Sequence, residues 1–139
     1  MRGVVLIAGV AVLALIGFGA WWMYWPHQMD GASAGGPMVD VVVPDLSAQA
    51  RRGEAVFNEN CATCHGRNAA GSEQGPPLVH RIYEPSHHGD GAFYRAVGLG
   101  VRAHHWRFGD MAAVDGVSER DVAHIVRYIR ELQRANGIF

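Results

Sequence analysis

A long apolar run lies near the start of the chain. Residues 4–25 carry no charged side chain and are almost wholly hydrophobic. About 20 helical residues at roughly 1.5 Å each span a hydrocarbon core of about 30 Å, and the run exceeds the roughly 7–15 apolar residues of a signal peptide. Aromatic side chains, which favour the membrane–water interface, gather at its far end: Trp21, Trp22, Tyr24 and Trp25. The pattern predicts one N-terminal transmembrane signal-anchor over residues 1–25, with a cleaved signal peptide as the alternative.

The next segment, residues 26–44, shows no overall helical or strand periodicity. Its stretch at 31–37 is rich in glycine, alanine and serine, which is typical of a flexible linker, so we expect a tether. Under the positive-inside rule Arg2 keeps the amino terminus in the cytoplasm, which places the tether outside it. Residues 39–43 are apolar apart from one aspartate, and we expect them to lie extended on the globular domain rather than on a partner.

Residues 45–139 carry the pattern of a helical domain. Ser47 is a plausible N-cap for a first helix. Its apolar side holds four residues: Ala50, Gly53, Val56 and Phe57. A glycine inside a helix costs roughly 1 kcal/mol relative to alanine, so Gly53 indicates that another helix comes very close.

The last helix has a defined start and one apolar face. Ser118 and Asp121 form a capping box. Apolar residues then recur at helical spacing: Val122, Ile125, Val126, Ile129 and Leu132. We expect this helix to cross the first one at Gly53, with Tyr128 packing at the edge of the stripe. Between the two, we expect a shorter helix capped by Asp90.

The chemistry of the chain centres on Cys61-Ala62-Thr63-Cys64-His65. Thiols at i and i+3 and an imidazole at i+4 lie along one face of a helical turn, so both sulfurs can bind a haem while His65 reaches its iron. Cys61 and Cys64 are the only cysteines. A disulfide would leave His65 unexplained, a thioredoxin-like pair needs a βαβ setting, and a structural zinc site needs four protein ligands. The motif therefore predicts one covalently bound haem c.

Composition narrows the range of partners. The 139-residue chain has a formal net charge of −1, so nucleic acid is not an obvious partner. The length suits one small domain plus an extra segment, and a haem adds apolar surface that so short a domain lacks. No nucleophile–base pair or pair of carboxylates stands out, so we expect no independent catalytic activity.

The spacing Gly53-x3-Phe57-x3-Cys61-x2-Cys64-His65, a later methionine and a terminal helix with a tyrosine resemble a small class I (monohaem) cytochrome c domain. The resemblance covers residues 45–136 and is to the membrane-anchored bacterial type. It implies an all-α fold in which the first and last helices cross and wrap one haem.

The resemblance also implies further contacts to the haem. In this family a carbonyl of a proline loop accepts the hydrogen bond of the iron-binding histidine, so Pro76 or Pro77 would hold His65. Leu78, next in that loop, would pack against the haem. Trp106 and Arg107 are candidates to donate to the haem propionates, with ordinary core and surface roles as the alternatives.

A methionine is the family's second axial iron ligand, in a loop before the last helix. Met111 has that position, although the proline that usually follows is replaced by Ala112. His104 and His105 are rival ligands, because imidazole binds iron strongly. An open sixth site is the remaining alternative.

These features predict a membrane-anchored, monohaem c-type cytochrome that carries single electrons between redox proteins of a respiratory or photosynthetic chain. The orientation of the anchor places the protein in the inner (cytoplasmic) membrane, with the haem domain at residues 45–139 in the periplasm. The alternative function is a haem-based sensor or ligand-binding protein with an open or labile sixth iron site.

Overall fold

The structure is a computed structural model that describes residues 36–139. The predicted transmembrane segment and most of the predicted tether lie outside these residues, and none of the helices that are described is long and apolar enough to cross a bilayer. The helical elements in chain order are α2 (Ala48–Asn60), α3 (Ala62–His65), η1 (Arg67–Ala69), η2 (Arg81–Tyr83), α4 (Asp90–Leu99) and α5 (Glu119–Ala135). Residues 36–139 contain no β-strand, so the all-α prediction is confirmed for this part of the chain.

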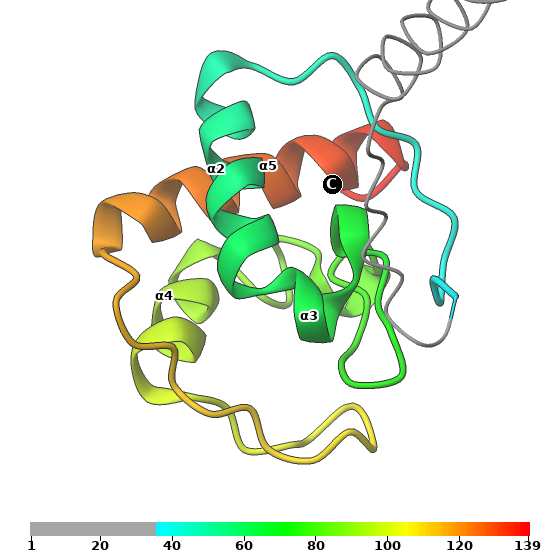
Figure 1. The fold of residues 1–139 in the computed structure, drawn as a ribbon. Coiled ribbons are helices and arrows are strands. Elements are labelled where there is room, and N and C mark those ends of the chain that lie inside the picture. Colours follow the sequence, from blue (N-terminus) through cyan, green and yellow to red (C-terminus); the bar gives the residue numbers. More distant parts are fainter. Residues whose placement is uncertain (1–35) are drawn as a thin grey trace, which may run out of the picture. The chain divides into compact units, whose positions relative to one another are not determined.

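The two longest helices within residues 36–139, α2 and α5, cross one another (Figure 1). At the crossing, a Cβ added to Gly53 would lie 1.9 Å from the carbonyl oxygen of His124 on α5 and 2.9 Å from the Ile125 nitrogen. No side chain fits at that separation, so the helices can pack this closely only because residue 53 is a glycine. The close approach predicted at Gly53 is confirmed.

The core lies where this crossing buries aromatic and aliphatic side chains. The rings of Phe57 and Tyr128, both fully buried, lie 5.6 Å apart in a tilted arrangement. The stripe predicted on α5 is buried, with exposed fractions of at most 6%. Burying each such side chain contributes roughly 1.5–3 kcal/mol, so this packing fixes the position of whatever follows α2.

Two of the three predicted helix N-caps are confirmed. The Ser47 side chain accepts from the Ala50 N–H at 3.1 Å, and Ser118 and Asp121 form the predicted capping box at the start of α5. The cap predicted at Asp90 is wrong: Gly89 is the N-cap and Asp90 is the first helical residue. The Asp90 carboxylate instead binds Arg130 of α5 at 2.9 Å.

The end of the predicted tether is part of the domain. The N–H groups of Met38 and Val39 both donate to the Ala70 carbonyl, at 3.0 and 3.2 Å. Val42 exchanges two hydrogen bonds of 2.9 Å with the Asn136 side chain beyond α5. Residues 39–43 thus lie on the domain as predicted, and hydrogen bonds to Ala70 and Asn136 hold the described end of the predicted 26–44 tether.

Candidate haem site

The cysteine motif lies in a tight turn at the end of α2. The Cys61 N–H donates to the Phe57 carbonyl at 2.8 Å, and the His65 N–H donates to the Cys61 carbonyl at 2.9 Å. Both cysteines are free thiols, with Cys61 half-buried and Cys64 exposed. The turn therefore presents two thiols and an imidazole within one short stretch, in an all-helical setting unlike that of a thioredoxin-type pair.

The surroundings of Cys61 weaken the acidity of its thiol. Burial, and then the neighbouring Cys64, raise the pKa of the Cys61 thiol to about 11. Reactive cysteines instead have thiol pKa values lowered to about 3.5–7.5. Cys61 is therefore a protonated thiol at neutral pH and a poor nucleophile for disulfide exchange.

The imidazole of His65 has a fixed tautomer. Its Nδ1 lies 2.9 Å from the carbonyl oxygen of Pro76; because a carbonyl only accepts, Nδ1 carries the hydrogen and Nε2 keeps a lone pair. Burial lowers the pKa of His65, and the bond to Pro76 opposes that effect. A neutral, oriented imidazole is the form that binds a metal. The carbonyl that holds His65 belongs to Pro76. Of the two alternatives, Pro76 therefore has this role, and the assignment to Pro77 is wrong by one residue.

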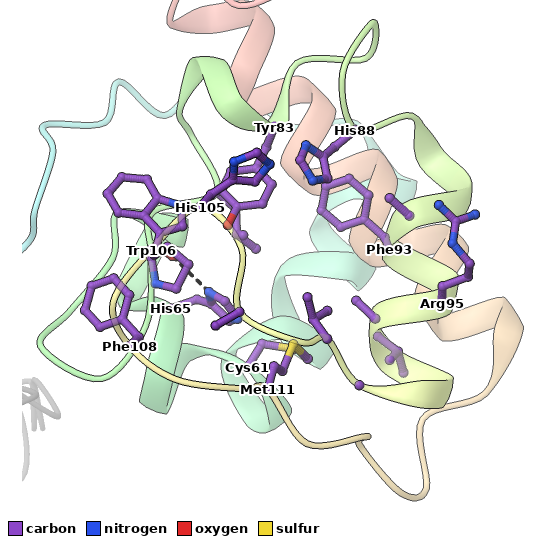
Figure 2. A pocket seen from close by; sticks show the side chains of 18 of the residues that line it. Cys61, His65, Tyr83, His88, Phe93, Arg95, His105, Trp106, Phe108 and Met111 are labelled. Atoms are coloured by element: carbon purple, nitrogen blue, oxygen red, sulfur yellow. Dashed lines mark hydrogen bonds between the residues drawn. The ribbon is translucent and has the colours of Figure 1, made fainter.

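His65 lines a cavity of about 470 Å³, a volume within the roughly 300–1,000 Å³ of small-molecule and cofactor sites. Figure 2 shows the side chains of Cys61, His65 and Met111 around one space. The predicted site residues that line the cavity are Cys61, His65, Leu78, Trp106 and Met111. Residues more than 40 positions apart in the sequence are thus brought together at one site.

The predicted donor Arg107 lies outside the cavity wall. Its neighbours Trp106 and Phe108 line the cavity, while Arg107 is exposed. The guanidinium-bearing residues of the wall are instead Arg95 and Arg102. Sequence reasoning missed these two. The apolar positions of α4 could have indicated which face of that helix borders the site, and so Arg95, but Arg102 follows α4 and had no such signal.

Met111 is held in place by its own backbone. Its N–H donates to the Val101 carbonyl and its carbonyl accepts from the Val101 N–H, both at 2.9 Å. The side chain of Asp110 also accepts from the Ala103 N–H at 2.8 Å. These bonds close residues 101–111 into a loop with Met111 at its base, so the position of Met111 does not depend on a following proline.

One buried donor in the cavity wall has no partner. The indole Nε1 of Trp106 is buried and makes no hydrogen bond within residues 36–139. Tyr83 is close enough for the indole N–H to oppose the rise that burial causes in its pKa, without reaching hydrogen-bond geometry. An unsatisfied buried N–H costs about 1–3 kcal/mol, so an acceptor at this wall is favoured. A haem carboxylate is such an acceptor. The Cys61 thiol, the His65 imidazole and the Met111 thioether of the cavity wall, with the exposed Cys64 thiol on the same turn as Cys61, make a set of groups that fits haem c.

Comparison with protein families matches residues 50–133 to the family described as Cytochrome c. The chain belongs to the cytochrome c family. Comparison with curated proteins and with solved structures gives no match. Family membership implies that the cytochrome c domain binds haem c and takes part in haem-based electron transfer.

The rival iron ligands lie at the rim of the cytochrome c cavity. His104 and His105 line it but are exposed. The Nδ1 of His104 lies 2.8 Å from the Arg102 carbonyl, and the Nε2 of His105 lies 3.2 Å from the Nε2 of His87. Both histidines are exposed, whereas Met111 is partly buried in the cavity wall, which favours Met111.

Proposed function

We propose that this protein is a membrane-anchored, monohaem c-type cytochrome that carries single electrons between redox proteins on the periplasmic side of the membrane. The observation that supports it most is that Cys61, His65 and Met111 line one largely apolar cavity. Bound haem c supplies one-electron ferrous–ferric chemistry at its iron.

The residues around the cavity have distinct roles in this proposal. Cys61 and Cys64 hold the haem covalently, and His65 and Met111 are the axial iron ligands. Ligation by a histidine and a methionine raises the reduction potential of the haem iron relative to ligation by two histidines. It also leaves no open iron position for a substrate. We therefore propose no independent enzyme activity. The Pro76 carbonyl orients His65, and apolar residues such as Leu78 keep water from the iron, which tunes the potential.

Leu99 supports a docking role for the rim of the cavity. It belongs to the cavity wall and yet is 81% exposed. Transient redox complexes bury less than about 1,200 Å², so a small apolar rim of this kind is enough for a partner. We propose redox proteins of a respiratory or photosynthetic chain as these partners.

Visible spectroscopy of the haem-loaded protein tests the ligand set. The ferric protein should show the far-red absorption of thioether-ligated iron, and Met111→Ala should lack it. Met38→Ala is the matched control, since Met38 lies in the docked N-terminal segment, and it should keep the band. Prompt binding of carbon monoxide by the unmodified ferrous protein would indicate an open sixth site and contradict the carrier role.

The membrane anchor needs a separate test. The haem-loaded protein should sediment with membranes, resist extraction by alkaline carbonate and be released by detergent. Leu13→Arg places a charge near the middle of the apolar run, where it costs about 2.5–3.5 kcal/mol, and should shift the protein to the soluble fraction. An unmodified protein that is already soluble would refute the anchor without affecting the haem assignment.

A further inference from the structure

Four histidine rings gather at the rim of the cavity. They come from two separate pairs in the sequence, at residues 87–88 and 104–105. The ring centroids of His104 and His105 lie 4.3 Å apart, those of His87 and His88 4.6 Å, and those of His87 and His105 5.1 Å. His87 and His105 are exposed and His88 is partly buried, so the cluster is open to solvent on one side.

The ring nitrogens of three of these residues converge. One nitrogen each of His87, His88 and His105 lies within 4.8 Å of the others. The Nε2 atoms of His87 and His105 are 3.2 Å apart. Zn–N bonds of 2.0–2.1 Å in a tetrahedral site place two ligand nitrogens about 3.3 Å apart, so this pair already has the spacing of two ligands of one ion.

The tautomers of the cluster leave lone pairs available. The Nδ1 of His88 lies 2.6 Å from the Ile82 carbonyl, and the Nδ1 of His104 lies 2.8 Å from the Arg102 carbonyl. Each Nδ1 must therefore donate, which leaves Nε2 as the unprotonated nitrogen. A histidine whose other nitrogen donates to a backbone carbonyl is the usual arrangement of a metal ligand.

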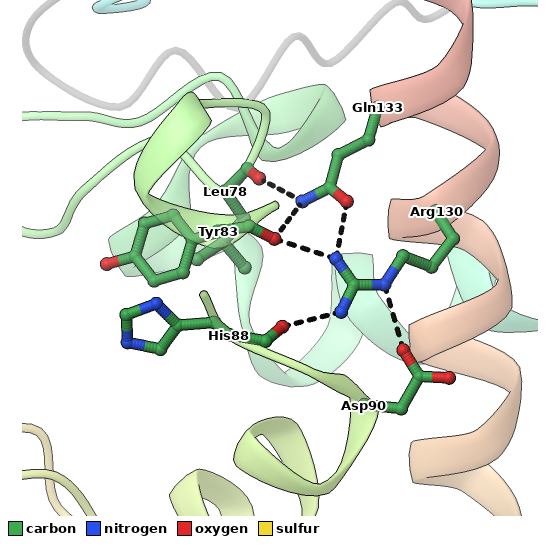
Figure 3. Close-up of polar contacts among 6 residues, drawn as sticks. All are labelled: Leu78, Tyr83, His88, Asp90, Arg130 and Gln133. Atoms are coloured by element: carbon green, nitrogen blue, oxygen red, sulfur yellow. Dashed lines mark hydrogen bonds and ion pairs between the residues drawn. The ribbon is translucent and has the colours of Figure 1, made fainter. Parts of the chain in front are cut away.

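A buried arginine holds the backbone under the cluster. Figure 3 shows the Arg130 guanidinium, on α5, donating to the backbone carbonyls of Tyr83 and His88, at 2.7 and 2.6 Å, and to Asp90 at 2.9 Å. Its side chain is only 8% exposed. Gln133, which is fully buried, donates to the Tyr83 carbonyl as well. The segment that carries His87 and His88 is therefore fixed before any ligand arrives, which lowers the ordering cost of binding.

We propose that His87, His88 and His105 bind one divalent late transition-metal ion, such as zinc, at the rim of the haem cavity, with His104 within reach as a fourth ligand. Neutral imidazole is a preferred ligand of Zn²⁺, Cu²⁺ and Ni²⁺. With three protein ligands, a zinc ion keeps a fourth position, which His104 or a water molecule fills. This site is distinct from the iron site and does not rest on the proposed electron-carrier function.

Zinc binding to the full-length, haem-loaded protein in detergent tests the proposal. The protein carries no polyhistidine tag and is stripped with a chelator, and bound Zn²⁺ is counted by equilibrium dialysis with metal analysis. One Zn²⁺ per chain is expected. Loss of a residue that only orients a metal ligand typically weakens metal binding by 10–100-fold. His87→Ala and His105→Ala each remove a ligand itself, so each should weaken zinc binding by at least that factor. His124→Gln removes an imidazole on α5, outside the cluster, and should leave the affinity unchanged.

The haem spectrum of each variant shows whether it is folded and whether the far-red band is kept. Both cluster variants change exposed side chains, and they should keep that band. Absence of stoichiometric zinc binding by the unmodified protein would overturn the proposal. So would full affinity in His87→Ala and His105→Ala. An unmodified protein that lacks the far-red band and binds no zinc, together with a changed ferric haem spectrum in His105→Ala, would instead assign His105 to the iron.

Discussion

Replacing Gly100 by alanine should loosen Met111 although the two residues are far apart in the sequence. Gly100 follows α4 and has φ 75° and ψ −177°, a region that is essentially restricted to glycine. An added Cβ would lie 2.4 Å from the carbonyl oxygen of Met111 and 3.1 Å from the Ala113 nitrogen. The substitution therefore strains the backbone and pushes directly on the residue proposed to bind iron.

The size of the effect follows from two contributions. A non-glycine residue in this conformation costs about 1–3 kcal/mol. Moving the Met111 carbonyl away breaks its 2.9 Å hydrogen bond with the Val101 N–H, at a net cost of about 0.5–1.5 kcal/mol. The sum is roughly 2–4 kcal/mol, which corresponds to about 30-fold or more in the equilibrium for holding the loop in place.

Two measurements on the ferric haem-loaded protein check this prediction. The far-red band reports the bond between Met111 and iron, and chemical denaturation reports the free energy of unfolding. Gly98→Ala is the matched control: Gly98 lies in α4, is exposed, and an added Cβ would meet nothing within 4 Å. In a helix that change should stabilise the protein by about 0.5 kcal/mol and leave the band intact.

The reasoning fails if the two alanine variants behave alike. A full far-red band in Gly100→Ala, with a free energy of unfolding equal to that of Gly98→Ala, would mean that the loop accommodates the side chain. Loss of the band with unchanged global stability would still fit, because the loop can open without unfolding of α2 and α5.

Three further substitutions test the packing and charge of the domain. Gly53→Ala should lower the free energy of unfolding by at least about 1–3 kcal/mol, because its Cβ would overlap the His124 backbone; a stabilised variant in urea denaturation would contradict the crossing. Arg130→Met should cost about 1–3 kcal/mol, since it leaves the part-buried His88 carbonyl without its donor and removes one of the two donors to the Tyr83 carbonyl, and an unchanged thermal midpoint would refute this. Hydrogen bonds from Ser118 lower the pKa of Asp121, so the stability they contribute is present at neutral pH and is lost as the pH falls through the native pKa, below the ordinary 3.8. Asp121→Asn should therefore be less stable than the unmodified protein at pH 7, and denaturation curves should converge near pH 2; a constant difference across this range would contradict the assignment.

Sequence patterns were sufficient for the helices that build the scaffold. The caps at Ser47 and Ser118 involve residues within three positions of one another, so they depend only on local chemistry. The apolar stripe of α5 and the isolated Gly53 predicted a close crossing, because a destabilising glycine inside a helix usually reflects close packing against another element. The cysteine motif likewise fixed two sulfurs and His65 to a single turn.

Contacts between distant segments could not be predicted in the same way. Sequence reasoning assigned Asp90 to a cap, but its carboxylate meets Arg130, 40 residues away. It left Pro76 and Pro77 as alternatives, because a one-residue difference in a loop depends on how that loop packs on His65. It named Arg107 and missed Arg95 and Arg102, since proximity to Trp106 in the sequence does not determine which side chains face the cavity.

Ala112 shows how the missing proline is compensated. A proline fixes its own φ and removes a donor, so it can stiffen the loop after a methionine ligand. Here the stiffness comes from the exchange of two hydrogen bonds between Met111 and Val101. That pairing brings the backbone of residues 111–113 against Gly100, where the hypothetical Cβ would also lie 3.2 Å from the carbonyl carbon of Ala112. In this chain the methionine loop is therefore held by close backbone packing at Gly100, at the end of α4, rather than by a proline after the methionine.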